Sequence, residues 1–587
     1  MVARVRNLTS SSSVAAYFHE EGGYYAAAGG DREAARAKAM EHRLASAWHG
    51  QGLAALGLKA GQKVSATMFE TILRGHVPGT NIRLGRKRDG KHEHRPGFDI
   101  TFSAPKSVSL AALLPTRKHP RGDRGVLRCH DEAVKATLDW IEETKLQTRG
   151  WDPATGRRPR VKGHGLAAAL FRHIASRNLD PQLHTHAVVA NMTRDAEGRW
   201  KSIEPTELHR NAILFGAYYR DQLARRLIAK GYSILPAMAG RVQSFEIAGY
   251  DRRLQAAFST RRKQMEAYMD ERGWDHSQAA AQIAALATRK RKAEPLHAML
   301  RTIWAARAGE LGEVPVVRRS QRGVSLPSVP SALEIVGRAM EHLEERQSVF
   351  AAHQLEALAL GHSPGRHTLE AIRDAIAWMV RDRHLVEATL RRADRSFVTD
   401  RALKAERAVI AAMKAGLREG MALADEETVA THLAGAGLTG GQEEAVRTIL
   451  LTPDRIVGVQ GRAGSGKTTM LAHVRELTTG KRLVVGLAPS AAAARVLERE
   501  TDMPARTLQW FLARCRAVDD AGPVIERLKA RYRGAVLVLD EASMVSTDQM
   551  RSLMRVAEEL EVARLVLVGD RRQLRAVEAG QPFRLLQ

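Results

Sequence analysis

The stretch FRHIASRNLDPQLHTHAVVANMT, residues 171–193, carries three histidines, His173, His184 and His186. Within it, LHTHAVVANM alternates polar with apolar residues and is rich in β-branched side chains, which predicts a β-strand. Residues two apart on a strand point to the same face, so His184 and His186 project together. The preceding run GLAAALFRHIAS predicts a second strand, and an Asp-Pro turn signal separates the two runs. A hairpin centred near Asn178 and Leu179 places His173 opposite His184, and all three imidazoles then converge on one face.

Three converging imidazoles predict a metal site. Neutral imidazole is a ligand for divalent transition metals, and three protein ligands leave coordination positions open. An open metal ion polarises a phosphate oxygen and orients the scissile bond. A lone strand histidine is usually an ordinary structural residue, but two at positions i and i+2 with a third across a turn favour the metal site. The donor set does not distinguish Mg²⁺, Mn²⁺ and Zn²⁺.

Tyrosines near the N-terminus supply a candidate nucleophile: Tyr17, Tyr24 and Tyr25. A phenol with a pKa near 10 is a weak nucleophile at neutral pH, so it needs a base or a strong electrostatic field. Taken alone, these tyrosines predict an aromatic cluster that packs an N-terminal helix. Beside the three-histidine motif, they predict an enzyme that cuts a DNA strand and stays bonded to its end.

Three parts of the sequence resemble the conjugative relaxases of the large relaxase–helicase (MobF) family. They are PQLHTHAVVAN with its upstream histidine, GFDITFSAPKSVSL at residues 97–110, and the aromatic pairs Tyr17-Phe18 and Tyr24-Tyr25. The resemblance covers most of the chain. It implies site- and strand-specific nicking of DNA at a plasmid transfer origin through a 5′-phosphotyrosine intermediate. One phosphoester replaces another, so cutting and rejoining need no ATP.

The resemblance also implies roles for individual residues. Tyr17 matches the first nucleophile, Tyr24 matches the second, and Tyr25 completes the second pair. Position 18 is Phe where relatives often have tyrosine, which leaves Tyr17 as the nucleophile of the first pair. Asp99 matches the acid beside the three histidine ligands. It either accepts the phenolic proton or orients a ligand histidine, and we favour the second role. How the two tyrosine pairs divide the work stays open.

A second chemical centre lies in RIVGVQGRAGSGKTTML, residues 455–471. An apolar strand-like run precedes a glycine-rich loop that opens a predicted helix, which is the context that a phosphate-binding loop requires. The glycines let backbone N–H groups wrap phosphates, while Lys467 reaches the terminal phosphates and Thr468 binds Mg²⁺. The predicted nucleotide-binding residues of this loop are Gly461, Gly464, Gly466, Lys467, Thr468 and Thr469.

Downstream segments complete a nucleotide site. AVLVLDEASMVS predicts a buried strand that ends at Asp540, which holds the Mg²⁺ shell, and Glu541, which activates water. Gln573 fits a γ-phosphate sensor, and Gln442 lies where related enzymes contact adenine. The order of these segments resembles superfamily 1 helicases of the RecD-like and relaxase-linked branch, so we expect ATP with Mg²⁺. Alternating apolar strands and helices predict an α/β lobe with mostly parallel strands.

Composition agrees with a nucleic-acid partner. Lys and Arg total 91 against 65 Asp and Glu, a net charge of +26, which favours binding to a polyphosphate. A generally Arg-rich composition gives the same balance, so charge alone does not decide. The two cysteines suggest no disulfide framework. The N-terminus has no signal-peptide core, and no uncharged apolar run is long enough to span a bilayer.

The fold expected from these patterns is multidomain, α+β and α/β. A relaxase domain at residues 1–295 is expected to hold an antiparallel sheet with helices and the three-histidine site. A helical connector with a winged-helix-like region follows at 296–431, and the first RecA-like P-loop lobe follows at 432–587. The chain stops soon after the last of these motifs, so we expect an incomplete motor with weak or no ATPase activity, cut from a longer relaxase–helicase.

Two rival functions stay open. A rolling-circle replication initiator or a helicase-linked transposase uses similar histidines, but in many of them the tyrosines follow the histidine motif. A decayed protein that binds single-stranded DNA and nucleotide without turnover is the second rival. The resemblance implies single-stranded DNA at the transfer origin as partner, together with accessory origin-binding proteins and a type IV secretion coupling protein. It also implies a cytoplasmic protein that is exported to recipient cells.

Overall fold

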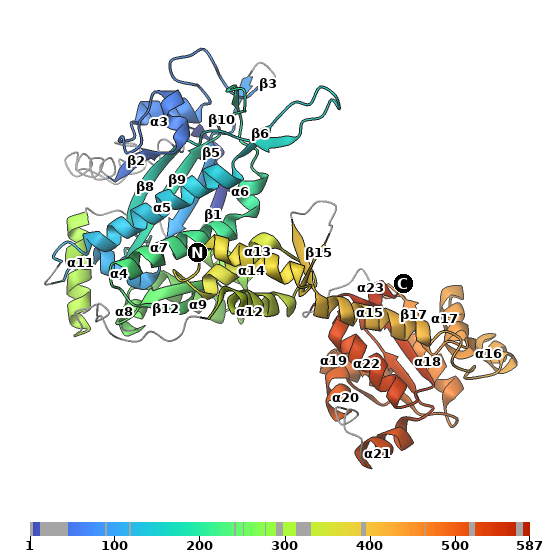
Figure 1. Ribbon diagram of the computed structural model, residues 1–587. Helices are drawn as coiled ribbons and strands as arrows, with labels where there is room; N and C mark the ends of the chain where they lie inside the picture. Colours follow the sequence, from blue (N-terminus) through green and yellow to red (C-terminus); the bar gives the residue numbers. More distant parts are fainter. Residues whose placement is uncertain are drawn as a thin grey trace. The chain divides into compact units, whose positions relative to one another are not determined.

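The computed structural model describes residues 4–11, 14, 45–88, 91–116, 119–239, 242–250, 252–275, 277–288, 297–312, 330–388, 395–462, 464–515, 523–570 and 579–586. The chain forms two compact units (Figure 1). The first comprises residues 1–339 and 353–375, and the second comprises residues 340–352 and 376–587. No helix among the described residues has both the length and the apolar character needed to cross a bilayer.

The first unit contains a five-stranded antiparallel sheet, as the sequence predicts. The strand order is β1-β5-β9-β8-β2. The central strand β9 and its neighbour β8 form the predicted hairpin, and they are the longest strands of the sheet. The strands are β1 (Arg4–Asn7), β2 (Ser46–His49), β5 (Gly97–Ser103), β8 (Ala168–Ala175) and β9 (Pro181–Ala190).

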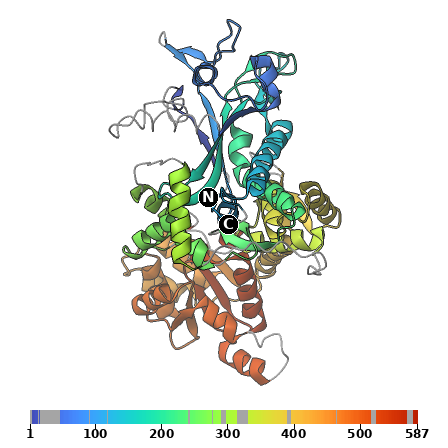
Figure 2. The same cartoon turned by 90° about the vertical axis from the view of Figure 1, so that its left-hand side faces the viewer.

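Helices α5 (Arg124–Lys145) and α7 (Ala212–Ala229) lie on one face of this sheet (Figures 1 and 2). The ring of Phe102 on β5 packs against Tyr219 of α7, with ring centroids 5.4 Å apart. The opposite face is apolar where α3 (Ala66–Leu73) covers it. There Phe69 packs edge-on against Phe171 of β8 in a buried cluster. Among the described residues, α5 and α7 therefore cover one face of the sheet, and α3 covers one end of the other face.

The hairpin turn is held by residues far away in the sequence. Leu179 adopts a left-handed backbone with φ of 63°, and its carbonyl accepts a 2.6 Å hydrogen bond from the Trp304 indole. The buried Asp180 carboxylate accepts from the backbone N–H and the hydroxyl of Thr260 at 2.9 and 3.0 Å. These contacts fix the direction in which β9 leaves the turn.

Shorter elements complete the first unit. They are η1 (Gln51–Leu56), β3 (Arg86–Arg88), β4 (Lys91–Glu93), α4 (Lys106–Leu113), β6 (Gln147–Arg149), β7 (Arg160–Lys162), β10 (Thr193–Arg194), β11 (Trp200–Lys201), α6 (Thr206–Arg210), β12 (Ile234–Ala239), β13 (Val242–Ile247), α8 (Arg252–Ala257), α9 (Thr260–Asp270), α10 (Gln278–Ala287), α11 (His297–Glu310) and α13 (Ala352–His362).

The predicted connector contributes helices and a small sheet. Helices α12 (Ala332–Glu344) and α14 (Leu369–Arg381) each have residues in both units. Strands β14 (Phe350–Ala351), β16 (Ser396–Thr399) and β15 (Leu385–Ala388) pair antiparallel in that order. The proposed boundaries at residues 295 and 431 stay a prediction.

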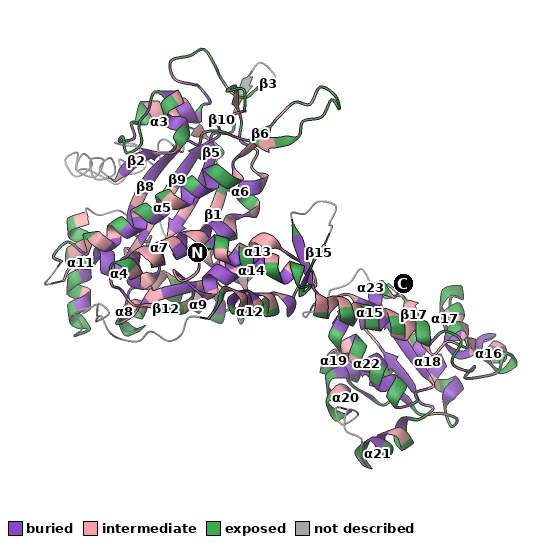
Figure 3. Ribbon diagram, viewed as in Figure 1, coloured by how far each residue is buried: buried purple, intermediate pink, exposed green. Residues whose placement is uncertain are grey.

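The second unit contains a parallel sheet, also as predicted. Its strand order is β17-β21-β20-β18-β19, and every pair is parallel. Strands β18, β20 and β21 are buried throughout (Figure 3), because helices pack on both faces, whereas β17 and β19 are partly exposed. The strands are β17 (Ile456–Gln460), β18 (Val484–Ala488), β19 (Ala505–Thr507), β20 (Val536–Leu539) and β21 (Arg564–Gly569).

The helices of the second unit divide between the two faces of the sheet. Apolar residues of α15 (Asp400–Ala415) and α22 (Thr547–Glu559) pack on one face, and those of α17 (Gly440–Leu451), α18 (Lys467–Thr478) and α19 (Ala491–Thr501) pack on the other. The remaining elements are α16 (Glu426–Leu433), α20 (Leu508–Arg514), α21 (Pro523–Tyr532), η3 (Ala542–Met544) and α23 (Pro582–Leu585).

Candidate functional site

The central hairpin brings the three predicted histidines together. His173 on β8 pairs directly with His184 on β9, and His186 lies two residues further along β9. The ring centroids are 5.3 Å apart for His173 and each of the other two histidines, and 5.4 Å apart for His184 and His186. The sequence prediction of a hairpin with three converging imidazoles is therefore confirmed.

The histidines lie on the sheet face away from α5 and α7. Between His184 and His186, the Thr185 hydroxyl is hydrogen-bonded to the buried His130 of α5 at 2.8 Å. Because side chains alternate along a strand, the two histidines of β9 point to the opposite face. Helix α3 covers the other end of this same sheet face. The three imidazoles therefore lie beside the edge of the apolar cluster that contains Phe69 and Phe171.

Two of the imidazoles have their tautomer set by oxygen atoms. The Nδ1 of His186 lies 2.9 Å from both carboxylate oxygens of Asp99, and the Nδ1 of His184 lies 2.9 Å from the Gln182 carbonyl. These oxygens only accept, so each Nδ1 carries the hydrogen and donates. In the neutral rings, Nε2 then carries the lone pair that a metal ion requires. This oxygen-oriented arrangement is typical of metal-binding histidines.

The spacing of the three rings fits a single metal ion. With nitrogen–metal bonds of about 2.1 Å, a ring centroid lies about 3.2 Å from the ion, and tetrahedral angles then separate two centroids by about 5.2 Å. The observed separations of 5.3 and 5.4 Å match this spacing. The donor set and the ring spacing both agree with a divalent transition metal on His173, His184 and His186.

Asp99 occupies the position expected for orienting a ligand. It lies on β5, where its Cα pairs with that of Val188 of β9, and its side chain is 8% exposed. The Thr101 hydroxyl, on the same face, lies 3.4 Å from Asp99 Oδ1 and 3.3 Å from Nδ1 of His186. The contact with His186 favours the orienting role among the two that the sequence leaves open.

Sequence reasoning missed two groups at this site. Thr101 is two residues from Asp99 on the same strand, and the two-residue period of a strand places both side chains on the same face. That period is the signal in the sequence that would have identified Thr101. The Gln182 carbonyl had no signal, because a backbone acceptor is visible only in the folded chain. The predicted tyrosines Tyr17, Tyr24 and Tyr25, and Phe18, lie outside the described residues.

A buried polar network supports β9 from the other face. His130 lies between the Tyr219 hydroxyl at 2.7 Å and the Thr185 hydroxyl at 2.8 Å. Burial lowers the pKa of His130 from 6.5 to about 3, with a further lowering from the charge of Arg172. The imidazole is therefore neutral at physiological pH, and both of its nitrogens are hydrogen-bonded.

The phosphate-binding loop of the second unit connects β17 to α18. Gly464 and Gly466 have φ of 73° and 71°, a left-handed conformation that glycine adopts without strain. The Lys467 ammonium lies over the loop and donates to the carbonyls of Gly461 at 3.1 Å and Arg462 at 3.0 Å. The predicted strand–loop–helix context is confirmed, and Thr468 and Thr469 open the helix.

Gln442 lies against this loop. Its amide nitrogen donates to the carbonyls of Ser465 and Gly466 at 3.1 and 3.3 Å, and its amide oxygen accepts from the backbone of Thr439 at 2.8 Å in a capping box. A Cβ at Gly466 would lie 2.2 Å from that amide nitrogen. The contact of Gln442 with adenine, which the family resemblance implies, stays a prediction. Its contact with the phosphate-binding loop is an additional structural role.

Acidic residues gather at the carboxyl ends of neighbouring strands. Asp540 and Glu541 follow β20, and the buried Asp570 follows β21, where it accepts from the Gln460 amide at 3.3 Å. Burial raises the pKa of Asp540 and, together with the charge of Asp540, that of Glu541, while Lys467 opposes both shifts. Ligands of parallel sheets bind at this edge. The predicted sensor Gln573 lies outside the described residues.

Two protein-family models match the chain. The TrwC relaxase model matches residues 11–311, just over half of the 587 residues, and includes the three histidines and Asp99. A model described as an AAA domain matches residues 437–587, which include the phosphate-binding loop. The two matches divide the chemical centres of the chain between them.

Individual proteins resemble parts of the chain. The multifunctional conjugation protein TraI of Escherichia coli is 32% identical over 340 residues, which are 54% of this chain and 18% of TraI. The conjugal transfer protein TraA of Agrobacterium fabrum is 36% identical over 29% of this chain and 15% of its own length. The chain therefore spans less than a fifth of these relatives. A metal-bound structure of conjugative relaxase TrwC with oriT DNA is 33% identical, with a TM-score of 0.44, over 54% of this chain and 100% of that chain.

Proposed function

The chain belongs to the TrwC relaxase family, and from this premise we propose that it nicks one DNA strand at a plasmid transfer origin. The nicking domain is joined to a nucleotide-binding helicase module. One observation carries this proposal. The imidazoles of His173, His184 and His186 converge on one sheet face, and oxygen atoms fix the tautomer of two of them.

In the proposed reaction the Tyr17 phenol attacks the scissile phosphorus. A bond forms between the phenolic oxygen and the 5′ phosphate, the bond from phosphorus to the 3′ oxygen breaks, and the 3′ hydroxyl leaves with a proton. Attack by that hydroxyl on the phosphotyrosine reverses the step without ATP. Tyr24 or Tyr25 serves a second round of strand transfer.

The residues around the phosphate have separate tasks. His173, His184 and His186 would hold a divalent ion, and its charge would polarise the scissile phosphate. Asp99 keeps Nδ1 of His186 protonated and turns its Nε2 toward the site, and the Gln182 carbonyl does the same for His184. Because these rings are already oriented, little reorganisation is needed when the phosphate arrives. Zn²⁺, Mn²⁺ and Mg²⁺ are all candidates for the ion.

The C-terminal lobe binds ATP with Mg²⁺ in this proposal. Lys467 contacts the terminal phosphates, Thr468 and Asp540 hold the Mg²⁺ shell, and Glu541 activates water. The glycines of the loop, Thr469, Gln442 and Gln573 complete the pocket. The positions of Asp540 and Glu541 at the strand edge beside Lys467 support this assignment.

The resemblance to conjugation proteins suggests the cellular setting. Single-stranded DNA at the transfer origin is the substrate, and accessory origin-binding proteins and a type IV secretion coupling protein are the partners. The protein acts in the cytoplasm of the donor and is exported to the recipient cell.

A covalent-adduct assay tests the nicking reaction. The full chain is incubated with Mn²⁺ and a labelled single-stranded oligonucleotide that carries the transfer origin, and the products are separated on a denaturing protein gel. We expect a protein–DNA band from the wild type and none from Tyr17→Phe or His184→Ala. The control is His49→Gln, because His49 also lies in the sheet and pairs with a carboxylate, Asp139, at 2.7 Å.

Each outcome has a distinct meaning. A band that survives Tyr17→Phe assigns the first cleavage to Tyr24 or Tyr25. A band that survives His184→Ala contradicts the three-histidine metal site. Binding of the oligonucleotide by wild type without any band, across all transfer-origin sequences tried, supports a binding protein that has lost turnover.

A further inference from the structure

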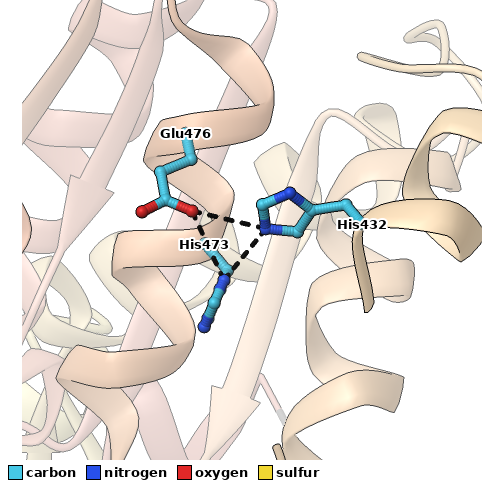
Figure 4. A group of neighbouring side chains, drawn as sticks. All are labelled: His432, His473 and Glu476. Atoms are coloured by element: carbon cyan, nitrogen blue, oxygen red, sulfur yellow. Dashed lines mark hydrogen bonds and ion pairs between the residues drawn. The ribbon is translucent and has the colours of Figure 1, made fainter. Parts of the chain in front are cut away.

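Two helices of the second unit bring a second group of metal-ligating side chains together. His432 lies in the last turn of α16, and His473 and Glu476 lie one turn apart on α18 (Figure 4). Residues 385–587 contain two histidines, and these are the two. Although 41 residues separate them in the sequence, Nε2 of His432 lies 2.9 Å from Nδ1 of His473. The pairing is a product of the fold.

The three donor atoms have the spacing of ligands around one ion. Oε2 of Glu476 lies 3.4 Å from Nε2 of His432 and 3.5 Å from Nδ1 of His473, and Figure 4 shows the three atoms pointing toward one another. A triangle with these sides has a circumradius of about 1.9 Å, so a point about 2.1 Å from all three donors lies just outside its plane. That is the usual bond length from Zn²⁺ to imidazole nitrogen and carboxylate oxygen.

A simple hydrogen-bonded cluster explains these distances less well. Only the contact between the histidines has the length of a good hydrogen bond, and the two contacts with the carboxylate exceed it. Donors about 2.1 Å from a tetrahedral ion are separated by about 3.4 Å, which is close to both carboxylate distances. Side-chain exposures of 28% for His432, 19% for His473 and 61% for Glu476 leave the group accessible to an ion from solution.

We propose that His432, His473 and Glu476 form a binding site for a divalent transition-metal ion of the zinc class, separate from the three-histidine site. Two imidazoles and one carboxylate suit Zn²⁺, Co²⁺ or Ni²⁺, whereas Mg²⁺ and Ca²⁺ prefer sites built from oxygen alone. Solvent supplies the remaining coordination positions.

The position of the site defines its role. His473 is six residues beyond Lys467 on α18, which corresponds to about 9 Å along the helix axis. An ion there is too far from Lys467 to contact the nucleotide phosphates that this lysine is proposed to bind. The ion joins the end of α16 to α18, the helix that follows the phosphate-binding loop. It therefore holds α16 against α18. The ion stabilises the folded lobe because it binds the folded state alone.

Zinc titration of the full chain tests this site independently of the nicking reaction. The parent protein is His184→Ala, which removes a ligand of the three-histidine site, and residual metal is stripped with a chelator. We expect one Zn²⁺ per chain by competition with a chromophoric chelator. Glu476→Gln is expected to weaken binding at least about tenfold, and the double replacement His432→Gln and His473→Gln to abolish it.

The matched control is His384→Gln. Nε2 of His384 pairs with Asp382 at 2.9 Å, so this variant removes a surface histidine–carboxylate pair in the same unit without touching the cluster. Its zinc affinity is expected to equal that of the parent. Because the Glu476 side chain is mostly exposed, Glu476→Gln is expected to fold normally.

Hydrogen exchange supplies a second measurement. Zn²⁺ is expected to slow amide exchange in α16 at least about threefold in the parent and to leave it unchanged in Glu476→Gln. The proposal is overturned if the parent binds no Zn²⁺, or if Glu476→Gln and the double histidine variant bind it as tightly as the parent. The proposal is also overturned if the chain with His184 intact binds Zn²⁺ and replacing His184 alone removes all of that binding.

Discussion

Replacing Asp99 with asparagine distinguishes the two roles that the sequence leaves open for this carboxylate. Both oxygens of Asp99 lie 2.9 Å from Nδ1 of His186, and the side chain is 8% exposed. A hydrogen bond to a buried charged group contributes about 1.5–3 kcal/mol, and a neutral one about 1 kcal/mol. Asp99→Asn keeps an acceptor but loses the charge, so about 0.5–2 kcal/mol of support for the metal-binding tautomer of His186 is lost. The metal dissociation constant should therefore rise roughly 2- to 30-fold.

The assay is a competition titration of the full chain with Zn²⁺ in the double variant His432→Gln and His473→Gln, which removes the second proposed site. Thr101→Val is the control, because its hydroxyl lies 3.3 Å or more from both Asp99 and His186 and contributes a weak contact. We expect it to change the affinity by less than about threefold.

The two roles separate cleanly in this experiment. If Asp99→Asn binds Zn²⁺ within twofold of the parent while cleavage of the oligonucleotide slows, the carboxylate acts on the nucleophile and the orienting argument is wrong. If affinity and cleavage fall together, and saturating metal restores the cleavage rate, the orienting role is supported.

Three further predictions concern stability and nucleotide binding. Because burial lowers the pKa of His130 to about 3 in the folded state, the unfolded chain binds more protons below pH 6.5. The stability of the first unit should fall by about 2 kcal/mol from this group between pH 7 and pH 5, and chemical denaturation should show a smaller fall in His130→Gln. Gly466→Ala combines a left-handed backbone with a Cβ 2.2 Å from the Gln442 amide, so nucleotide affinity by fluorescence titration should drop at least about tenfold, and Gln442→Ala should restore part of it. Arg564 is fully buried and donates to two backbone carbonyls at 2.8 Å, so Arg564→Met should destabilise the second unit by about 2–4 kcal/mol in the same denaturation assay, and an unchanged midpoint would contradict the importance of these bonds.

Local patterns in the sequence identified the elements that carry the chemistry. The alternation in LHTHAVVANM predicted a strand with two histidines on one face, and the Asp-Pro signal predicted the turn that brings His173 opposite His184. The phosphate-binding loop was equally readable, because its glycines, lysine and flanking strand and helix are consecutive in the chain. Such features depend on a period of two residues or on a short loop, so the residues that decide them lie within a few positions of one another in the sequence.

The partners of these residues were decided by the tertiary structure. Asp99 reaches His186 across 87 residues because β5 pairs with β9 in one register, and a shift by one residue would turn Asp99 to the other face. His432 and His473 had no signal in the sequence, and they meet because α16 ends beside α18. The side chains that each strand and loop presents follow from neighbouring positions in the chain, because backbone period is local. Only packing decided which of them meet, because strand register and helix contacts depend on the whole buried core.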